Sequence, residues 1–223
     1  MKIYTNSNIM KRIYFTVLFF IIASTTITAQ YFPIDTARLN NAYRVLLQNP
    51  QSKELQFEFL NAFPRTWQDF NSTYKYCSDE GYDLSMYSIA YKHIQALGDC
   101  VAINDTILCN KLIALSVGAT LDADAPNYLQ GVLHNIMKRS NDTFMHCLSK
   151  IYKGHQMQFW QFYWSNIVDG RSLQDEFVEL YNKNKEKYPT IMKTMSIAFE
   201  YFNNGVLFMG DFNNFINRRI YLY

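Results

Sequence analysis

The sequence predicts an all-α protein, built as an irregular array of about ten short antiparallel helices. Residues that favour helix starts recur along the chain, and the helix-length segments between them end at glycine or before proline. Alternation of Val, Ile and Thr over the length of a strand is rare, so the hydrophobic pattern does not favour a sheet. Aromatic residues make up 17% of the chain, and such large rings can fill the spaces between helices.

Two helices are expected before residue 65. Asp35 can cap a helix that runs to about Gln48, because its side-chain oxygen can accept from the first free backbone N–H groups. Ser52 can cap the next helix in the same way. That second helix should stop at Phe63, because Pro64 disfavours helical backbone in the residue before it.

Three further helices are expected before residue 119. Thr66-Trp67-Gln68-Asp69 resembles a capping box, with Asp in place of the usual Glu at its fourth position. The next two helices are expected from Ser85 to Leu97, closed by Gly98, and from Asn104 or Asp105 to about Val117, closed by Gly118.

The second half of the chain continues this pattern of starts and stops. Ser172-Leu173-Gln174-Asp175 resembles another capping box, and residues 206–223 fit either a short helix or an extended chain. Helices are expected from Asp124 to Arg139, from Asn141 to Lys153 with Gly154 as the closing residue, from about Gln156 to Val168, from Ser172 to about Lys187, and after Pro189-Thr190.

The spacing of the helices suggests how they pair. Brief connections favour antiparallel neighbours, and the starts of the expected pairs, Thr66, Asn104, Asn141 and Ser172, follow one another at intervals typical of helical repeats. The pairs share no common signature. We therefore expect helical hairpins in a weakly solenoid-like array, with a closed multi-helix bundle as the alternative.

Residues 1–29 are expected to form a signal peptide, and translation can also begin at Met10. The basic pair Lys11-Arg12 precedes an apolar run from Ile13 to Ala23, and small or hydroxylated residues follow as far as Ala29. The apolar run is shorter than the ~20 residues that span a bilayer. A cleavable leader is therefore expected, and an uncleaved anchor is the alternative.

Cleavage after Ala29 would leave Gln30 at the start of a single helical domain, residues 30–223, in the periplasm or outside the cell. No membrane span is expected after cleavage. Three of the 21 basic residues and none of the 19 acidic residues lie in the leader, which leaves the rest with a net charge of −1. No basic cluster remains beyond Arg218-Arg219, so we expect no nucleic-acid partner.

The exported part of the chain contains the four cysteines, Cys77, Cys100, Cys109 and Cys147. An exported protein can form disulfides, and four cysteines allow three pairings. Cys100 and Cys109 flank an expected turn between helices, so they are the first candidates for a pair. Free buried thiols are the alternative. The spacing matches no zinc site.

Two nearby aspartates, Asp122 and Asp124, first suggest a metal site. A calcium loop starting at Asp122 would need a bidentate Glu at its twelfth position, where the chain has Leu133. An N-cap role for Asp124 explains more, because Pro126 then falls in the first turn of the helix, where its missing N–H does no harm. We expect a helix start and no metal.

No local pattern indicates catalysis or a cofactor. The sequence has no nucleophile elbow, phosphate loop or HExxH, and its four histidines are not paired at helical spacing. Trp160 and Trp164 lie in a segment whose aromatic residues surround the helix, which favours a buried core helix. A ligand-stacking platform formed by these two residues is the alternative, and Trp67 is a third stacking candidate.

Two segments carry a resemblance to a known group of proteins. FEFLNAFPRTW (residues 57–67) and LDADAPNYLQ (residues 121–130) resemble parts of uncharacterised exported all-helical proteins of Gram-negative gut anaerobes. The resemblance implies an all-helical domain exported to the periplasm. It transfers no catalytic or binding residue.

We expect a non-enzymatic protein that binds another macromolecule, most plausibly a protein. Helical arrays present extended surfaces, and no catalytic motif competes with this interpretation. Its most concrete form is an immunity-type protein that neutralises a toxin. The alternatives are a glycan-binding accessory protein and a cell-wall or glycan hydrolase.

The first prediction concerns export. The mature protein should begin at or near Gln30, because the residues before it have the charge and hydropathy pattern of a cleaved leader. Intact-mass measurement of the protein from the periplasmic fraction checks this start. Membrane-bound protein that retains the leader would contradict the prediction.

Overall fold

The computed structural model describes residues 34–76, 86–121, 123–165 and 173–203. These residues contain ten α-helices, one 3-10 helix and no strand, which confirms the all-α class. Several expected features lie outside the described residues: the leader with its Ala29–Gln30 cleavage point, Cys77, Asp122, the Ser172 cap and the segment 206–223.

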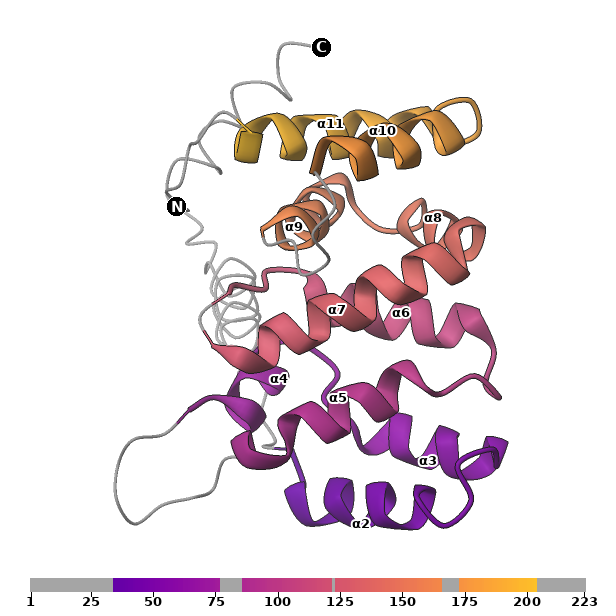
Figure 1. Ribbon diagram of the computed structural model, residues 1–223, viewed down its shortest axis with the longest axis vertical. Coiled ribbons are helices and arrows are strands. Elements are labelled where there is room, and N and C mark those ends of the chain that lie inside the picture. Colours follow the sequence, from indigo (N-terminus) through magenta and orange to yellow (C-terminus); the bar gives the residue numbers. More distant parts are fainter. Residues whose placement is uncertain (1–33, 77–85, 122, 166–172, 204–223) are drawn as a thin grey trace, which may run out of the picture. The chain divides into compact units, whose positions relative to one another are not determined.

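The elements are numbered as in Figure 1. They are α2 (Thr36–Leu46), α3 (Lys53–Ala62), α4 (Trp67–Tyr74), the 3-10 helix η1 (Tyr87–Ile89), α5 (Ala90–Gly98), α6 (Asp105–Ser116), α7 (Asp124–Arg139), α8 (Asn141–Leu148), α9 (Lys153–Trp164), α10 (Leu173–Asn184) and α11 (Pro189–Asn203).

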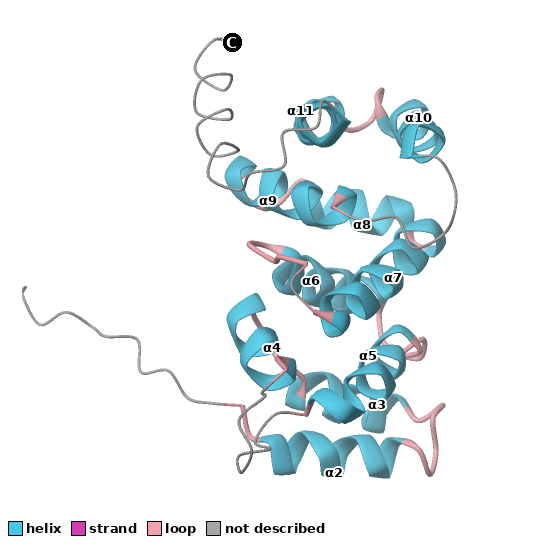
Figure 2. Ribbon diagram, turned by 60° about the vertical axis from the view of Figure 1, so that its left-hand side comes forward, coloured by secondary structure: helices cyan, strands magenta, loops and turns pink. Residues whose placement is uncertain are grey.

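The helices of this unit lie in successive layers. Figures 1 and 2 show α2 and α3 at one end of the unit and α10 and α11 at the other. The most extensive packing joins α2 to α3, α5 to α7, α6 to α8 and α9 to α11. After the first hairpin, each of these pairs skips one helix along the chain, so neighbouring layers interlock.

The expected caps at Asp35, Ser52, Thr66 and Gly118 are confirmed, whereas the helix expected from Ser85 begins as an α-helix only at Ala90, after the 3-10 helix η1. Asp35 Oδ1 accepts from the backbone N–H of Arg38 at 2.8 Å, and Ser52 caps α3 in the same way. Thr66 and Asp69 form both hydrogen bonds of a capping box. Gly118, past the end of α6, has φ +76°, a left-handed conformation that closes a helix most easily when the residue is glycine.

The expected end of α8 is wrong, because Gly154 does not close this helix. α8 stops at Leu148, and Gly154 is the second residue of α9. The glycine there leaves room for a neighbouring ring. A Cβ at this position would lie 2.6 Å from the ring of Tyr152, which lies beside the first turn of α9.

Two helices, α3 and α9, each carry a buried glutamine that links them to other parts of the chain. Gln56 and Gln156 are each the fourth residue of a helix and are almost fully buried. Gln56 Nε2 donates to the carbonyl of Pro50 at 2.7 Å, and its Oε1 accepts from the N–H of Ala102 at 2.8 Å. Gln156 Nε2 donates to the carbonyl of Leu148 at 3.0 Å, and its Oε1 accepts from a threonine of α11. Each glutamine thus links its own helix to residues just before that helix and to a later part of the chain.

Helix α9 is buried over most of its surface, and its aromatic residues all lie in the core, while the face with Gly154, Gln158 and Gln161 is half-buried. Trp160 is 0% exposed and Trp164 is 1% exposed, so neither can stack on a ligand at the surface, and the stacking alternative is wrong for both. Neither indole N–H has a hydrogen-bond partner among the described residues. Trp67 is half-buried and lies parallel to the ring of Phe70, with 5.6 Å between centroids. Its main contact is therefore with the core.

The expected Cys100–Cys109 disulfide is not formed. Cys100, Cys109 and Cys147 are free and buried. Cys100 follows the end of α5, and its Sγ turns back to donate to the carbonyl of Ala96 at 3.2 Å. Cys109 lies in the core face of α6. Burial raises the pKa of both the Cys100 and the Cys109 thiol to about 12, so neither is a ready nucleophile.

The buried position of α9 predicts that Trp160→Ala and Trp164→Ala are folding mutants. Each substitution removes a large core side chain and should lower the free energy of unfolding by ~3–5 kcal/mol. Trp67→Ala is the matched control, with a smaller loss because this ring is only half-buried. Denaturant titration measures all three. Near-wild-type stability of both α9 variants, with native tryptophan emission at solvent-exposed wavelengths, would contradict this account.

Candidate functional site

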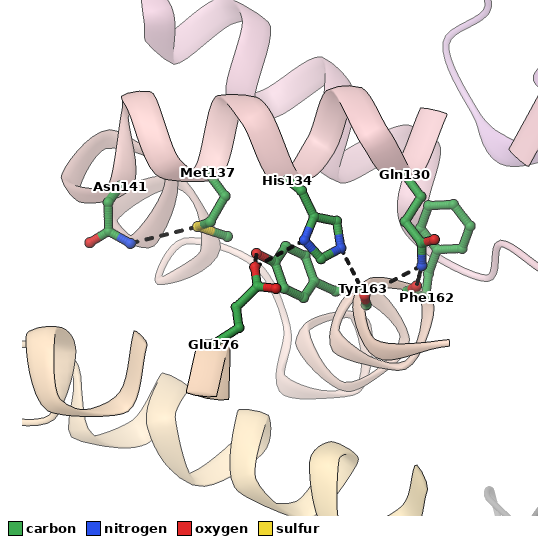
Figure 3. A network of polar contacts seen from close by, with 7 residues as sticks. All are labelled: Gln130, His134, Met137, Asn141, Phe162, Tyr163 and Glu176. Carbon is green, nitrogen blue, oxygen red and sulfur yellow. Dashed lines mark hydrogen bonds and ion pairs between the residues drawn. The ribbon is translucent and has the colours of Figure 1, made fainter. Parts of the chain in front are cut away.

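A buried network of polar side chains joins α7, α9 and α10 (Figure 3). His134 Nδ1 lies 2.9 Å from Glu176 Oε1, and the hydroxyl of Tyr163 donates to the same carboxylate oxygen at 2.7 Å. The rings of His134 and Tyr163 stack with 4.0 Å between centroids. A histidine, a carboxylate and a tyrosine so close together could form a catalytic centre. Whether they do depends on the hydrogen-bond partners that each group already has.

The network completes the hydrogen bonding of the end of α9. The last carbonyl groups of a helix have no partners within the helix, and at a buried end other donors must supply them. Gln130 and His134, one turn apart on α7, do so here together with Ser165, whose hydroxyl donates to the carbonyl of Phe162 at 2.7 Å. Gln130 Nε2 donates to the carbonyl of Phe162 at 2.7 Å, and His134 Nε2 lies 3.2 Å from the carbonyl of Tyr163 (Figure 3).

The surroundings of His134 fit a doubly protonated ring. One ring nitrogen faces a carboxylate and the other faces a backbone carbonyl, and both of these groups are acceptors. Burial raises the pKa of Glu176, but the hydrogen bonds from His134 and Tyr163 and the charge of His134 outweigh burial, so the pKa is lowered overall. Both nitrogens of His134 are hydrogen-bonded, so His134 and Glu176 hold α7, α9 and α10 together. His134 has no free nitrogen that could act as a base on a substrate.

A second buried histidine, His93, belongs to the core. It is 0% exposed, and the rings of Tyr43, Phe59 and Tyr74 surround it. Its Nδ1 lies 3.1 Å from the hydroxyl of Tyr74, while its Nε2 has no partner in the described part of the chain. Burial lowers the pKa of His93 to about 4, so the ring is neutral at physiological pH.

Four tyrosines and an aspartate form a group at the surface, which we call the tyrosine surface: Tyr76, Tyr91 and Asp124 are exposed, and Tyr87 and Tyr128 are half-buried. Tyr76 is 66% exposed and Tyr91 is 55% exposed. The ring of Tyr76 meets that of Tyr87 edge to face at 5.3 Å, and Tyr91 meets Tyr128 in the same way at 5.1 Å. The hydroxyl of Tyr87 donates to Asp124 Oδ2 at 2.5 Å, which links the first pair to the helix that carries Tyr128.

Helical spacing places these residues on one face. Asp124 and Tyr128 are one turn apart on α7, and Tyr87 and Tyr91 are one turn apart across η1 and the start of α5, which packs on α7. The predicted N-cap role of Asp124 is wrong, because Ala123 precedes α7 and Asp124 is its first helical residue. The Asp124 carboxylate instead holds Tyr87 and, by its hydrogen bond, raises the pKa of that phenol.

Sequence reasoning selected other aromatic residues as candidate ligand contacts. It gave Trp67, Trp160 and Trp164 as stacking candidates only in its alternative interpretation, and it missed the tyrosine surface. The available signal was the pair Asp124–Tyr128, an acid and an aromatic residue one helical turn apart. Its partners come from two other segments of the chain.

Comparison of the chain with protein-family models, curated proteins and solved structures finds no match. Within the described residues, no three His, Cys, Asp or Glu side chains are grouped as they would be around a metal ion. The helices described here include none with the length and apolar character needed to cross a membrane. The class that can be stated is an all-α protein with an exposed tyrosine surface.

The buried state of His93 predicts a pH-dependent stability. The pKa of about 4 in the folded state is below the ordinary 6.5, so between these values the unfolded chain binds more protons. The free energy of unfolding should therefore fall by roughly 2 kcal/mol as the pH decreases from 6.5 to 4.5. Denaturant titrations at several pH values measure this slope.

A matched pair of variants identifies the group responsible. His93→Gln keeps a hydrogen-bonding group near Tyr74 but does not titrate, so it should lose most of the slope. His155→Gln removes an exposed histidine and should keep the pH slope of the wild type. An unchanged slope in His93→Gln would show that another group causes the pH dependence.

Proposed function

We propose that the protein acts by binding another protein, and that the tyrosine surface is its contact site. The observation that carries this proposal is the exposure of several adjacent tyrosines, led by Tyr76 and Tyr91, on packed helices. Tyrosine offers a large apolar face and a hydroxyl on a side chain with few rotatable bonds. It is therefore enriched at protein interfaces, where it loses little conformational entropy on binding.

The arrangement of the rings favours a protein partner over a sugar. A sugar ring stacks best on an open aromatic face. Here each pair of rings meets edge to face, with interplanar angles of 71° and 77°, so one ring of each pair has a face covered by its neighbour. The result is an uneven surface with hydroxyls, suited to the varied side chains of a protein. The glycan-binding alternative is kept as an outcome of the experiment below.

The most concrete form of this function is an immunity-type protein that occludes an incoming toxin in the periplasm. Two features support it: the expected leader of residues 1–29, and a contact surface already fixed before binding by the Tyr87–Asp124 hydrogen bond. Rigid surfaces lose less entropy on binding. The hydrolase alternative has less support, because the buried carboxylate Glu176 is held by His134 and Tyr163.

Capture of partners by the full chain, expressed with its leader, tests the proposal. Proteins recovered from the periplasmic fraction are identified by mass spectrometry, and the Kd is then measured with the purified partner. The double variant Tyr76→Ala/Tyr91→Ala should weaken binding at least about tenfold, as expected for loss of central aromatic contacts. Its melting temperature should stay near the wild-type value, because both rings are exposed.

Tyr152→Ala is the matched control, since Tyr152 is 75% exposed but lies at the start of α9, away from the tyrosine surface. It should bind the partner like the wild type. A partner that binds the double variant as tightly as the wild type would refute the assigned surface. Binding to a glycan array that only the double variant loses would replace the protein partner with a carbohydrate.

A further inference from the structure

Two cysteines of the core belong to helices that pack on each other. Cys109 lies on α6 and is 0% exposed, and Cys147 lies on α8 and is 3% exposed. The structure shows both as thiols. Neither residue belongs to the tyrosine surface or to the network around His134, so the pair requires an explanation independent of the proposed function.

The sulfur of Cys147 lies against the first turn of α6. Its Sγ is 3.9 Å from the carbonyl oxygen of Thr106. In an α-helix this oxygen points along the axis toward the residues three and four positions later, and the first of these is Cys109. The sulfur of Cys147 therefore lies within about one helical turn of Cys109.

The same face of α6 makes a second contact with the start of α8. Asp105, one turn before Cys109, accepts from the hydroxyl of Ser140 at 2.6 Å, and Ser140 is the residue that precedes α8. Burial raises the pKa of the Cys109 thiol, and the next largest effect on this pKa comes from Cys147, ahead of the effect of Asp105. Electrostatic effects weaken with distance, so this order fits two neighbouring sulfurs.

Cys100 has different neighbours. It follows the end of α5, a helix that packs mainly on α7, and its Sγ turns back toward the carbonyl of Ala96. Of the three described cysteines, Cys109 and Cys147 are thus the two whose helices pack extensively on each other. Packed helices have axes ~8–10 Å apart and Cα atoms ~2.3 Å from each axis, so facing residues can reach the Cα separation of ~4.4–6.8 Å that a disulfide needs.

We propose that Cys109 and Cys147 form a disulfide that joins α6 to α8 in the exported protein. The proposal rests on the expected export, because disulfides form and persist in oxidising compartments, and it does not depend on the tyrosine surface. The bond closes a loop that contains the whole of α7, so it restricts the conformations of the unfolded chain.

The bond forms by exchange with an oxidant that itself contains a disulfide, such as oxidised glutathione. One cysteine loses its proton, and its thiolate attacks a sulfur of the oxidant, which gives a mixed disulfide and releases one thiol of the oxidant. The thiolate of the second cysteine then attacks the protein sulfur of the mixed disulfide and releases the other thiol. The two cysteines lose two electrons and two protons, and the oxidant takes up both. Because both thiols are buried in the folded chain, the exchange precedes the packing of α8 on α6.

Disulfide mapping of the full mature chain tests the pairing. Free thiols of protein from the periplasmic fraction are alkylated in denaturant, and the unreduced chain is digested and analysed by mass spectrometry. We expect a cross-linked pair of peptides that contain Cys109 and Cys147 and that separate on reduction. The same mapping after refolding of the purified chain in a glutathione buffer tests the pairing even if the leader is retained in the cell. A failed export prediction and a failed pairing are therefore distinguishable.

Variants identify the two sulfurs. Cys109→Ser should lose the cross-link and leave Cys147 open to alkylation in denaturant, whereas Cys100→Ser is the matched control that should keep the cross-link. The double variant Cys77→Ser/Cys100→Ser retains only the proposed pair, and its oxidised form should melt at least about 5 °C above its reduced form.

The mapping of the wild type needs no substitution, so it decides the question even if a variant does not fold. The proposal is wrong if both Cys109 and Cys147 of the wild type are alkylated after refolding with oxidised glutathione, or if either is bonded to a different cysteine. None of these outcomes depends on the partner that the tyrosine surface contacts.

Discussion

The fold depends on how the end of α9 is supplied with hydrogen-bond donors inside the core. The last residues of this helix, Phe162, Tyr163 and Trp164, are buried, so hydrogen-bond donors from the protein are needed for the carbonyls there. Gln130 and His134 of α7 provide the donors, and Glu176 of α10 balances the charge that His134 brings. One aromatic helix is thereby attached to two others through directional contacts. Hydrophobic packing alone would leave its rotation and depth less strictly defined.

Buried side-chain hydrogen bonds also fix α3 and α9 on a smaller scale. Gln56 and Gln156 each bind a carbonyl of the preceding turn and reach a later segment of the chain with the other end of the amide. Apolar contact between short helices is weakly directional. A buried amide that hydrogen-bonds to both segments fixes the position of one relative to the other. The tyrosine surface can therefore be built on helices whose relative positions are fixed, which is what a preformed contact site requires.

Local features of this fold could be predicted from the sequence, and long-range ones could not. The caps at Asp35, Ser52 and Thr66 involve residues three apart, so their pattern is visible in the chain. His134 and Glu176 are 42 residues apart, and nothing in the sequence indicates that they meet. Gly154 was misinterpreted because, in the sequence, a glycine in the first turn of a helix resembles one that ends the helix before it.

The candidate site shows the same division. The pair Asp124–Tyr128 could be read from the chain, but the surface it belongs to also requires Tyr76, Tyr87 and Tyr91, from two other segments.

The neutral amides of Gln56 and Gln156 also bear on the response of this fold to ionic strength. Several ion pairs of the described residues lie at the surface, such as Arg38–Glu58, with side chains 55% and 63% exposed, and dissolved ions screen pairs of this kind. The two glutamines carry no charge and are buried, so dissolved salt should change the strength of their hydrogen bonds very little. The contacts that the two amides make should therefore persist from dilute to concentrated salt.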